Sequence, residues 1–213
     1  MKKQAKPPVF NGVTFTQEIA SQVVGDATYR RCRFDGTALD HRELRECRFV
    51  ECAFVRANLT LARFNASTFQ SCDLRGARIA GCNLFSVTFE DCKLVGTDFT
   101  GDVTLTATTF RRCDLDLARF RGVSLAKLVF EKCSLQEADL SLTDLEETSF
   151  LACNLARADW TEAAFDRTDL RGSNLTGMDW RRQDLGGTII TSDQLREIAI
   201  GMGIQVIEMG IAK

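Results

Sequence analysis

A large apolar residue recurs at every fifth position over most of this chain. The first series runs from Phe34 to Phe99 and the second from Leu105 to Ile190, and together they hold 32 consecutive apolar centres. Since only about 30% of residues would qualify by chance, coincidence is excluded. Neither an α-helix, with about 3.6 residues per turn, nor a flat strand, with its alternating side chains, produces a period of five. The chain therefore predicts a coil with several equal sides.

A longer period within the repeat indicates how many sides each coil has. The position two before each centre is mostly small or a cysteine, and all nine cysteines of the chain lie there. Seven cysteines are separated by 20 residues, except for one step of 21: Cys32, Cys52, Cys72, Cys92, Cys113, Cys133 and Cys153. Six phenylalanines at the centres follow the same spacing: Phe49, Phe69, Phe89, Phe110, Phe130 and Phe150. Twenty residues per coil means four sides of five residues each.

These two series predict what fills the coil. The centre and the residue two before it would point inward, and neighbouring coils would stack at the β spacing of ~4.8 Å. Each side chain would then lie above its equivalent one coil down, so that the phenylalanines and the cysteines form ladders. We expect the cysteines to behave as small hydrophobes rather than as nucleophiles or metal ligands.

The short units carry a recognisable pattern. Ala-Asp-Leu-Ser-Leu (138–142) and Ser-Asn-Leu-Thr-Gly (173–177) follow A(D/N)LXX. The chain thereby resembles the pentapeptide-repeat family, and the resemblance implies an all-β solenoid, a right-handed quadrilateral β-helix. Over residues 29–190 this helix would make about eight coils.

The two ends depart from the repeat. Residues 1–28 are expected to form an N-terminal cap that includes a degenerate repeat at Phe10 and Phe15. Residues 191–213 begin with Thr191-Ser-Asp-Gln, which resembles a capping box, and predict a short amphipathic helix. Gly203 would end this helix, and a strand-like segment follows from Ile204.

The tail allows two interpretations, a simple cap of the solenoid end or a dimerisation module. In the second, its apolar residues would form a homodimer interface: Leu195, Ile198, Ala199, Met202, Ile204, Val206 and Ile207.

A closer resemblance covers parts of the chain. Residues 169–175 through 203–207 look like the C-terminal end of the Qnr and MfpA proteins, and 10–15, 32–36 and 130–135 add local similarity to Qnr. This resemblance implies a dimer joined through the tail that protects a type II topoisomerase. Two sizeable loops of Gram-negative Qnr proteins have no counterpart here, so the chain is closer to the loop-free MfpA type, although MfpA proteins are more acidic.

One irregularity interrupts the repeat between Phe99 and Phe110, which are separated by 11 residues instead of ten. The extra residue lies within Thr100, Gly101 and Asp102. We interpret it as a one-residue bulge at a corner. It is either a tolerated surface insertion or a protrusion that contacts a partner.

No catalytic, metal-binding or cofactor-binding motif is found. Nucleophile–base sets need a histidine or an equivalent base, and the single histidine, His41, has no such partner in the pattern. The odd number of cysteines argues against a closed disulfide set and favours a reducing cytoplasm. No apolar run is long enough for a membrane span, and no signal peptide is expected. The chain is therefore not expected to be an enzyme or to bind a small-molecule substrate.

Charge is distributed unevenly, although the net charge is only −2. Residues 1–89 hold 13 basic and 8 acidic side chains, whereas residues 131–170 hold 10 acidic and 3 basic. The acidic stretch is either an ordinary solvated surface or a mimic of duplex DNA. Under the second interpretation the candidate topoisomerase-facing residues are Glu137, Asp139, Asp144, Glu146, Glu147, Asp159, Glu162 and Asp166.

The resulting functional hypothesis is a DNA-mimicking homodimer that engages DNA gyrase or topoisomerase IV. It would protect the enzyme from a poison, either a fluoroquinolone or a natural product, and so give antibiotic resistance. It would bind no nucleic acid itself. The alternative is a rigid structural or adaptor module with an unrelated protein partner.

Overall fold

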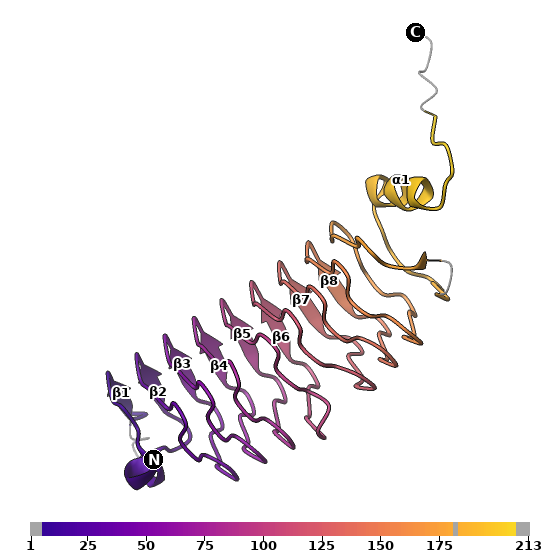
Figure 1. The fold of residues 1–213 in the computed structure, drawn as a ribbon. Helices are drawn as coiled ribbons and strands as arrows, with labels where there is room; N and C mark the ends of the chain where they lie inside the picture. Colours follow the sequence, from indigo (N-terminus) through magenta and orange to yellow (C-terminus); the bar gives the residue numbers. More distant parts are fainter. Residues whose placement is uncertain (1–5, 181–182, 208–213) are drawn as a thin grey trace, which may run out of the picture.

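The chain forms a stack of coils with one short strand per coil on the same side (Figure 1). The computed structural model describes residues 6–180 and 183–207. Eight parallel strands pair in chain order: β1 (Val9–Asn11), β2 (Thr28–Arg30), β3 (Arg48–Val50), β4 (Thr68–Gln70), β5 (Thr88–Glu90), β6 (Thr109–Arg111), β7 (Val129–Glu131) and β8 (Ser149–Leu151). The predicted β-solenoid of pentapeptide repeats is confirmed.

Each coil has four sides, which we number by the centre residues of the first full coil. Face 1 contains Tyr29 and the strands, and faces 2, 3 and 4 are centred on Phe34, Leu39 and Leu44. The residues on either side of a centre belong to the same face. Single parallel bridges join successive coils on faces 2 to 4: Arg33↔Ala53, Ala38↔Asn58 and Glu43↔Arg63. The residues of each of these three pairs are 20 apart, and pairs that span the bulge, such as Asn83↔Thr104, are 21 apart. The period read from the sequence is therefore the length of one coil.

The interior is a set of stacked side chains. On face 1 the rings of Phe110, Phe130 and Phe150 lie parallel, with centroids 4.9 and 4.8 Å apart, and the same column continues back to Tyr29. The nine cysteines are buried and unpaired. Many donate hydrogen bonds to main-chain carbonyls of the preceding coil, as Cys82 does to Leu59. Burial raises the pKa of Cys82 to about 12, which keeps this thiol protonated at neutral pH.

The corners explain the polar half of the repeat. The second residue after a centre adopts a left-handed conformation, as at Leu61 with φ 59°. The residue before a centre often closes this turn through its side chain. The Asp139 carboxylate, for example, accepts a hydrogen bond from the N–H of Ser141 at 3.0 Å. Asp and Asn have this capacity because their oxygen reaches a backbone N–H two residues on.

The N-terminal segment extends the stack. Strand β1 pairs with β2, and Phe10 and Phe15 stack on Tyr29 and Phe34 at 5.0 and 4.8 Å. A 3-10 helix, η1 (Gln17–Gln22), follows and buries Ala20. The degenerate repeat is therefore the first, incomplete coil of the solenoid.

The C-terminal end is closed by helix α1 (Ser192–Gly201). The capping box of Thr191 and Gln194 is formed. The helix ends in a Schellman motif, in which Gly203 (φ 83°) and Ile204 donate to the carbonyls of Ile200 and Ala199. Both signals predicted from the sequence are confirmed.

The prediction of a strand from Ile204 onward is wrong for residues 204–207, the part of this segment that the structure describes. Residues 204–207 are exposed and belong to no strand, and the rest of that segment lies outside the described residues. After the helix the chain leads away from the coils (Figure 1), and a strand needs a neighbouring strand to satisfy its backbone. Helix α1 and η1 are also too short to cross a bilayer, and the described residues contain no apolar helix long enough to do so.

Candidate functional site: an acidic surface on two adjacent faces

The fold divides the eight candidate carboxylates unequally among its faces. Seven lie on faces 3 and 4 or at their corners, within the coils that follow residue 129: Asp139, Asp144, Glu146, Glu147, Asp159, Glu162 and Asp166. Glu137 lies at the corner between faces 2 and 3, where Arg157 of the next coil pairs with it. The acidic surface is therefore defined as these seven residues, without Glu137.

On face 3 two carboxylates of successive coils lie directly above one another. Asp139 and Asp159 are partners in a parallel bridge. Like charges in facing positions cost stability, so this stacking is not explained by a gain in folding free energy from the charges. Both residues also close a corner, since Thr161 donates to Asp159 from its N–H at 2.9 Å and from its hydroxyl at 2.6 Å. These bonds hold the pKa of Asp159 below its usual value, so it is ionised at neutral pH.

On face 4 several carboxylates share one cation. Arg167 lies 3.1 Å from Glu146, 2.8 Å from Glu147 and 3.7 Å from Asp166, measured from its guanidinium nitrogen to the carboxylate oxygens. Arg167 is therefore a basic residue among the seven carboxylates, and Arg119 of the preceding coil is the bridge partner of Asp139. Arg121 of the preceding coil reaches its border, where it donates to Ser141 at 2.8 Å. The surface keeps a clear excess of negative charge.

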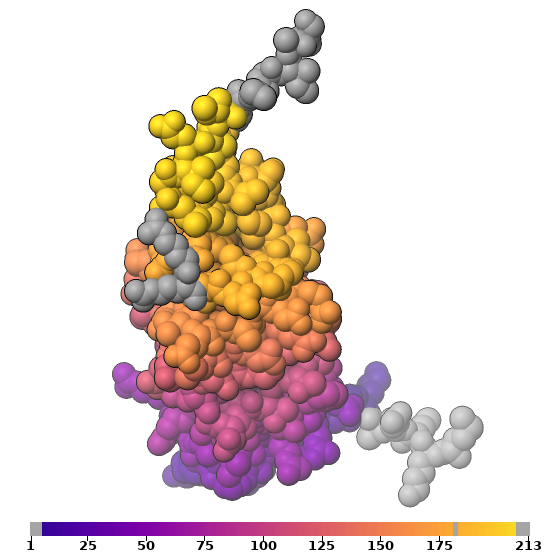
Figure 2. Space-filling model, turned by 90° about the vertical axis from the view of Figure 1, so that its right-hand side faces the viewer, coloured from indigo at the N-terminus to yellow at the C-terminus, as the bar shows by residue number. Residues whose placement is uncertain are grey.

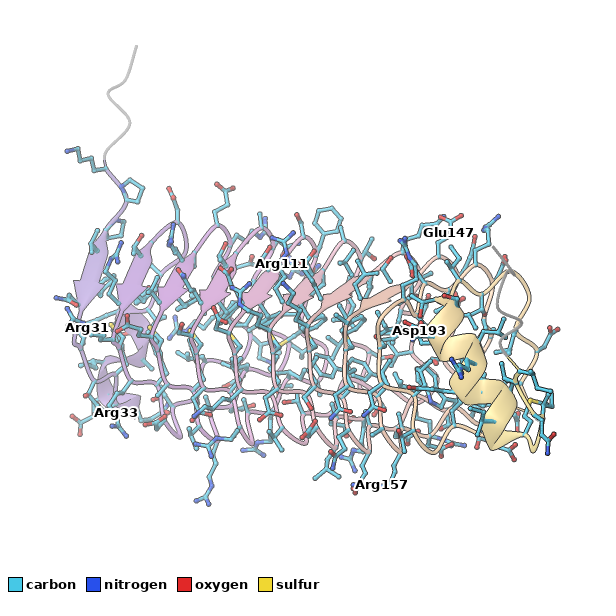
Figure 3. The ribbon with its side chains drawn as sticks, turned by 90° about the horizontal axis from the view of Figure 1, so that it is seen from above. Arg31, Arg33, Arg111, Glu147, Arg157 and Asp193 are labelled. Atoms are coloured by element: carbon cyan, nitrogen blue, oxygen red, sulfur yellow. The ribbon has the colours of Figure 1, made fainter. Side chains whose placement is uncertain are left out.

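Faces 1 and 2 of the same coils are balanced. Glu131 lies 3.4 Å from Arg111, and Asp169 lies 2.6 Å from Arg171. Figure 3 shows Glu147 and Arg157 projecting from opposite sides of the stack. The charge imbalance of this half of the chain is therefore confined to one side of the rod.

The N-terminal arginines are partly neutralised by neighbours. Arg33 pairs with Asp35 at 2.7 Å, and Arg45 and Arg63 both contact Glu43 at 2.8 and 3.2 Å. This half of the chain thus carries dispersed charge pairs rather than a single basic patch. Where one glutamate contacts two arginines, as at Glu43, one positive charge remains in excess.

The bulge lies at the corner between faces 3 and 4. There the turn covers three residues, Thr100, Gly101 and Asp102, whereas other corners use two. The carbonyl of Gly101 accepts a hydrogen bond from Gly81 of the preceding coil. A Cβ on Gly101 would lie 3.1 Å from that of Ala80, so a small residue is favoured. Glu162 of the acidic surface lies at the same corner, three coils further along the stack.

The tail exposes most of its candidate interface residues. Leu195, Ile204 and Ile207 are 58%, 55% and 78% exposed, Met202 and Val206 are also exposed, and Ile198 and Ala199 are half-buried. Ile200 is 57% exposed and was not among the candidates, because the helical spacing selects a single stripe. The side chains of Leu195, Ile200, Ile204 and Ile207 are thus each more than half exposed.

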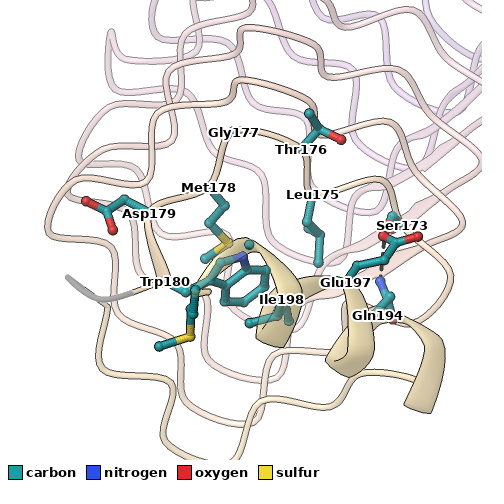
Figure 4. Close-up of a pocket in the computed structure, with 12 residues that line it drawn as sticks. Ser173, Leu175, Thr176, Gly177, Met178, Asp179, Trp180, Gln194, Glu197 and Ile198 are labelled. Atoms are coloured by element: carbon teal, nitrogen blue, oxygen red, sulfur yellow. Dashed lines mark hydrogen bonds between the residues drawn. The ribbon is translucent and has the colours of Figure 1, made fainter. Parts of the chain in front are cut away.

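A cavity of about 470 Å³ separates the last coil from helix α1. Met178 and Trp180 line it from the coil, and Ile198 and Met202 line it from the helix (Figure 4). Seen from the C-terminal end, the helical segment stands on the last coils (Figure 2). The helix therefore covers the end of the core only in part.

The described residues contain no group of three or more Cys, His, Asp or Glu side chains placed to hold a metal ion. The carboxylates of the acidic surface are spread over coils instead of converging on one point. What this arrangement offers chemically is an extended anionic face.

The fold defines the chain as a β-solenoid, and the sequence comparison names its class. The model of the pentapeptide repeat region matches residues 24–99 and 103–191, so the chain belongs to the pentapeptide-repeat proteins. The match is interrupted at the bulge, residues 100–102. No curated protein sequence matches the chain.

Solved structures share the fold over nearly the whole chain. A trypsin-treated variant of QnrB1, described as a plasmid-mediated fluoroquinolone resistance protein, is 22% identical with a TM-score of 0.72, over 95% of this chain and 98% of that one. Full-length QnrB1 is 21% identical with a TM-score of 0.63, over 93% and 98%. At this level of identity the likeness demonstrates a common architecture.

Proposed function

We propose that this protein binds a type II topoisomerase, DNA gyrase in the first instance, by presenting an anionic rod in place of DNA. Binding would protect the enzyme from a poison that acts on its DNA complex. The observation that carries the proposal is the clustering of seven carboxylates, with Arg167 among them, on faces 3 and 4.

The acidic surface has the chemistry that a DNA-binding groove selects. Such grooves carry Lys and Arg side chains that neutralise phosphates. A row of carboxylates on a rigid scaffold offers the same sign of charge without the cost of ordering a flexible chain. The stacked Asp139 and Asp159 support this use, because their proximity gives the fold no electrostatic benefit of its own.

The tail supports a homodimer. Leu195, Ile200 and Ile207 expose apolar side chains at the end of the rod, and a second copy of the same tail would cover them. Eight coils at ~4.8 Å give roughly 40 Å per subunit, so two subunits joined at this end would form a rod of roughly 80 Å. The two acidic surfaces would then lie near its middle.

The comparison with QnrB1 supports the choice of the first poison. That protein is described as giving fluoroquinolone resistance, and it shares the fold and nearly the full length of this chain. A fluoroquinolone is therefore the first compound to test, and a natural-product poison the second.

The test is a gyrase supercoiling assay with ciprofloxacin, into which the protein is titrated. Restored supercoiling supports the proposal. Glu146→Gln with Glu147→Gln should then weaken protection, whereas Glu131→Gln with Glu137→Gln should not. Both pairs remove two charges from residues that contact an arginine and have side chains 37–44% exposed.

No effect on gyrase or topoisomerase IV, with either class of poison, would reject the proposal. It would leave the rigid adaptor module as the explanation of the fold. Equal loss of protection in both glutamate pairs would show that net charge matters and that the position of the acidic surface does not.

A further inference from the structure

Next to the acidic surface, face 4 carries a stretch whose outward side chains are uncharged, although its corners hold Asp102 and Lys127. In the coils between residues 83 and 126 the side chains on both sides of its centres are neutral. We call these residues the neutral stretch: Asn83, Phe85, Thr104, Thr106, Ser124 and Ala126. The other faces of these coils are charged: Glu90 and Arg111 on face 1, Lys93 and Asp114 on face 2, and Asp98 and Arg119 on face 3.

The neutral stretch contains an exposed aromatic ring. Phe85 is 47% exposed, while the phenylalanines at the centres are buried in the stack. The repeat does not require a large apolar residue at this position, which faces outward one residue after the centre Leu84. Exposed aromatic side chains in uncharged surroundings are typical of the centres of protein interfaces.

Two exposed leucines border the same face. Leu61 and Leu142 are 47% and 42% exposed at the corner between faces 3 and 4. Both occupy the corner position, where positive φ is common to most coils, so their backbone conformation belongs to the fold. Their exposed side chains add apolar surface beside the neutral stretch.

The neutral stretch and the acidic surface are continuous. The Ser124 hydroxyl donates to the Asp144 carboxylate at 2.9 Å, and Leu142 lies between Asp139 and Asp144 in the chain. One partner surface can therefore cover both. It would need basic side chains opposite the carboxylates and an apolar recess opposite Phe85.

We propose that the neutral stretch, with Phe85 as its anchor, is a docking surface for a protein whose contact region combines basic side chains with an apolar recess. This inference rests on the proposed function, since the partner is taken to be the same topoisomerase. It adds that binding has an apolar component besides the attraction between charges. The acidic surface would set the orientation and the salt dependence of binding, and Phe85 would slow dissociation.

The test measures gyrase binding by the full chain and its variants at two salt concentrations. Phe85→Ser should weaken binding by about tenfold or more at both concentrations, since an interface anchor acts through burial. Leu117→Ser is the matched control, because Leu117 is 54% exposed on the corner between faces 2 and 3. Glu146→Gln with Glu147→Gln should weaken binding mainly at low salt, because salt screens exposed charges.

A second variant keeps the test decisive if Phe85→Ser alters folding. Thr106→Arg adds a large charged side chain to the neutral stretch and should also weaken binding, whereas Gln136→Arg, at the equivalent position of face 2, should not. If the unsubstituted protein binds gyrase and the Phe85→Ser and Thr106→Arg variants bind equally well, this inference is overturned and the proposed function is not. Absence of binding by the unsubstituted protein overturns the proposed function and this inference with it.

Discussion

The side-chain amide of Gln194 donates a hydrogen bond to the main-chain carbonyl of Leu170 at 2.7 Å, across the open end of the solenoid. The same nitrogen also donates to the carbonyl of Ser173 at 2.8 Å. The side-chain oxygen of Gln194 accepts a hydrogen bond from the N–H of Gly172 at 3.3 Å. In the other coils the equivalent groups are satisfied by the next coil, for example the carbonyl of Cys153 by the Asn174 N–H and that of Phe150 by the Ser173 hydroxyl. One buried side chain therefore replaces part of the coil that is missing.

Replacing Gln194 should loosen this end. We expect Gln194→Ala to cost about 1–3 kcal/mol, because it removes a donor from the carbonyls of Ser173 and Leu170, the acceptor of the Gly172 N–H and the capping box of Thr191. Gln194→Glu should cost at least as much at neutral pH, since it directs a carboxylate at the same carbonyls. Urea unfolding measures the change, and Gln205→Ala, at an exposed position, is the control. A Gln194→Ala variant as stable as the control would contradict the sealing role.

The aromatic column should be sensitive to a single gap. Phe130 is fully buried between Phe110 and Phe150, and Phe130→Ala should destabilise the protein by about 3–5 kcal/mol. Phe85→Ala, at an exposed position, should change stability by less than about 0.5 kcal/mol. Chemical denaturation of both variants separates the two roles. Similar losses would show that the outward and inward positions are wrongly assigned.

The corner aspartates should separate charge from structure. Asp159→Asn keeps an oxygen that can accept from Thr161, so stability should change little while topoisomerase binding falls. Asp159→Ala removes the acceptor as well and should cost about 0.5–1.5 kcal/mol. Thermal unfolding and binding are measured for both variants. If Asp159→Asn destabilises the protein as much as Asp159→Ala, the hydrogen bond from Thr161 is not the source of the stability that Asp159 provides.

The tail should control the oligomeric state. Leu195→Asp and Ile200→Asp place a charge on exposed positions of α1, so they should convert a dimer into a folded monomer. Ile198→Asp should also disturb the end of the core, since Ile198 lines the cavity beneath the helix. Val9→Asp, at 65% exposure on the opposite end, is the control. Light scattering reports the mass, and a monomeric unsubstituted protein would reject the dimer.

Stability should decrease in acid. Hydrogen bonds and charge from Arg75 and Arg171 lower the pKa of Asp73 and Asp169 in the folded protein. A lowered pKa stabilises the fold above the unfolded value of about 3.9, and this contribution is lost as the pH falls through the folded pKa. Thermal unfolding between neutral pH and pH about 2 should show the loss. Asp169→Asn should reduce this loss, because it removes one of the two carboxyls whose pKa is lowered.

The repeat could be read without a structure because it is written in single residues. An inward centre such as Phe130 must be large and apolar in every coil, and a neighbour such as Cys133 must be small. The helix cap could be predicted in the same way, since Thr191 and Gln194 form hydrogen bonds with the backbone within one turn. The strand expected from Ile204 was not, because strand formation depends on a partner backbone that the sequence does not identify.

The candidate site was only half visible in the sequence. The acidic excess of residues 131–170 is a matter of counting. The division of these charges among the faces cannot be counted from the chain. Glu137 and Glu146 both follow an apolar centre in the sequence, but they lie on different sides of the rod. Phe85 was passed over because it falls between two centres, although that offset is the signal that it faces outward.

The coil length, the inward side chains and the position of the bulge could be predicted from the chain alone, because each follows from the spacing of residue types. Which charges lie together and which are neutralised became known only from the folded arrangement. Arg157 meets Glu137 across one coil, and Arg167 gathers Glu146 and Glu147 in the same way. Such contacts join residues about a full coil apart, so they depend on how side chains lie on neighbouring coils and not on their order in the chain.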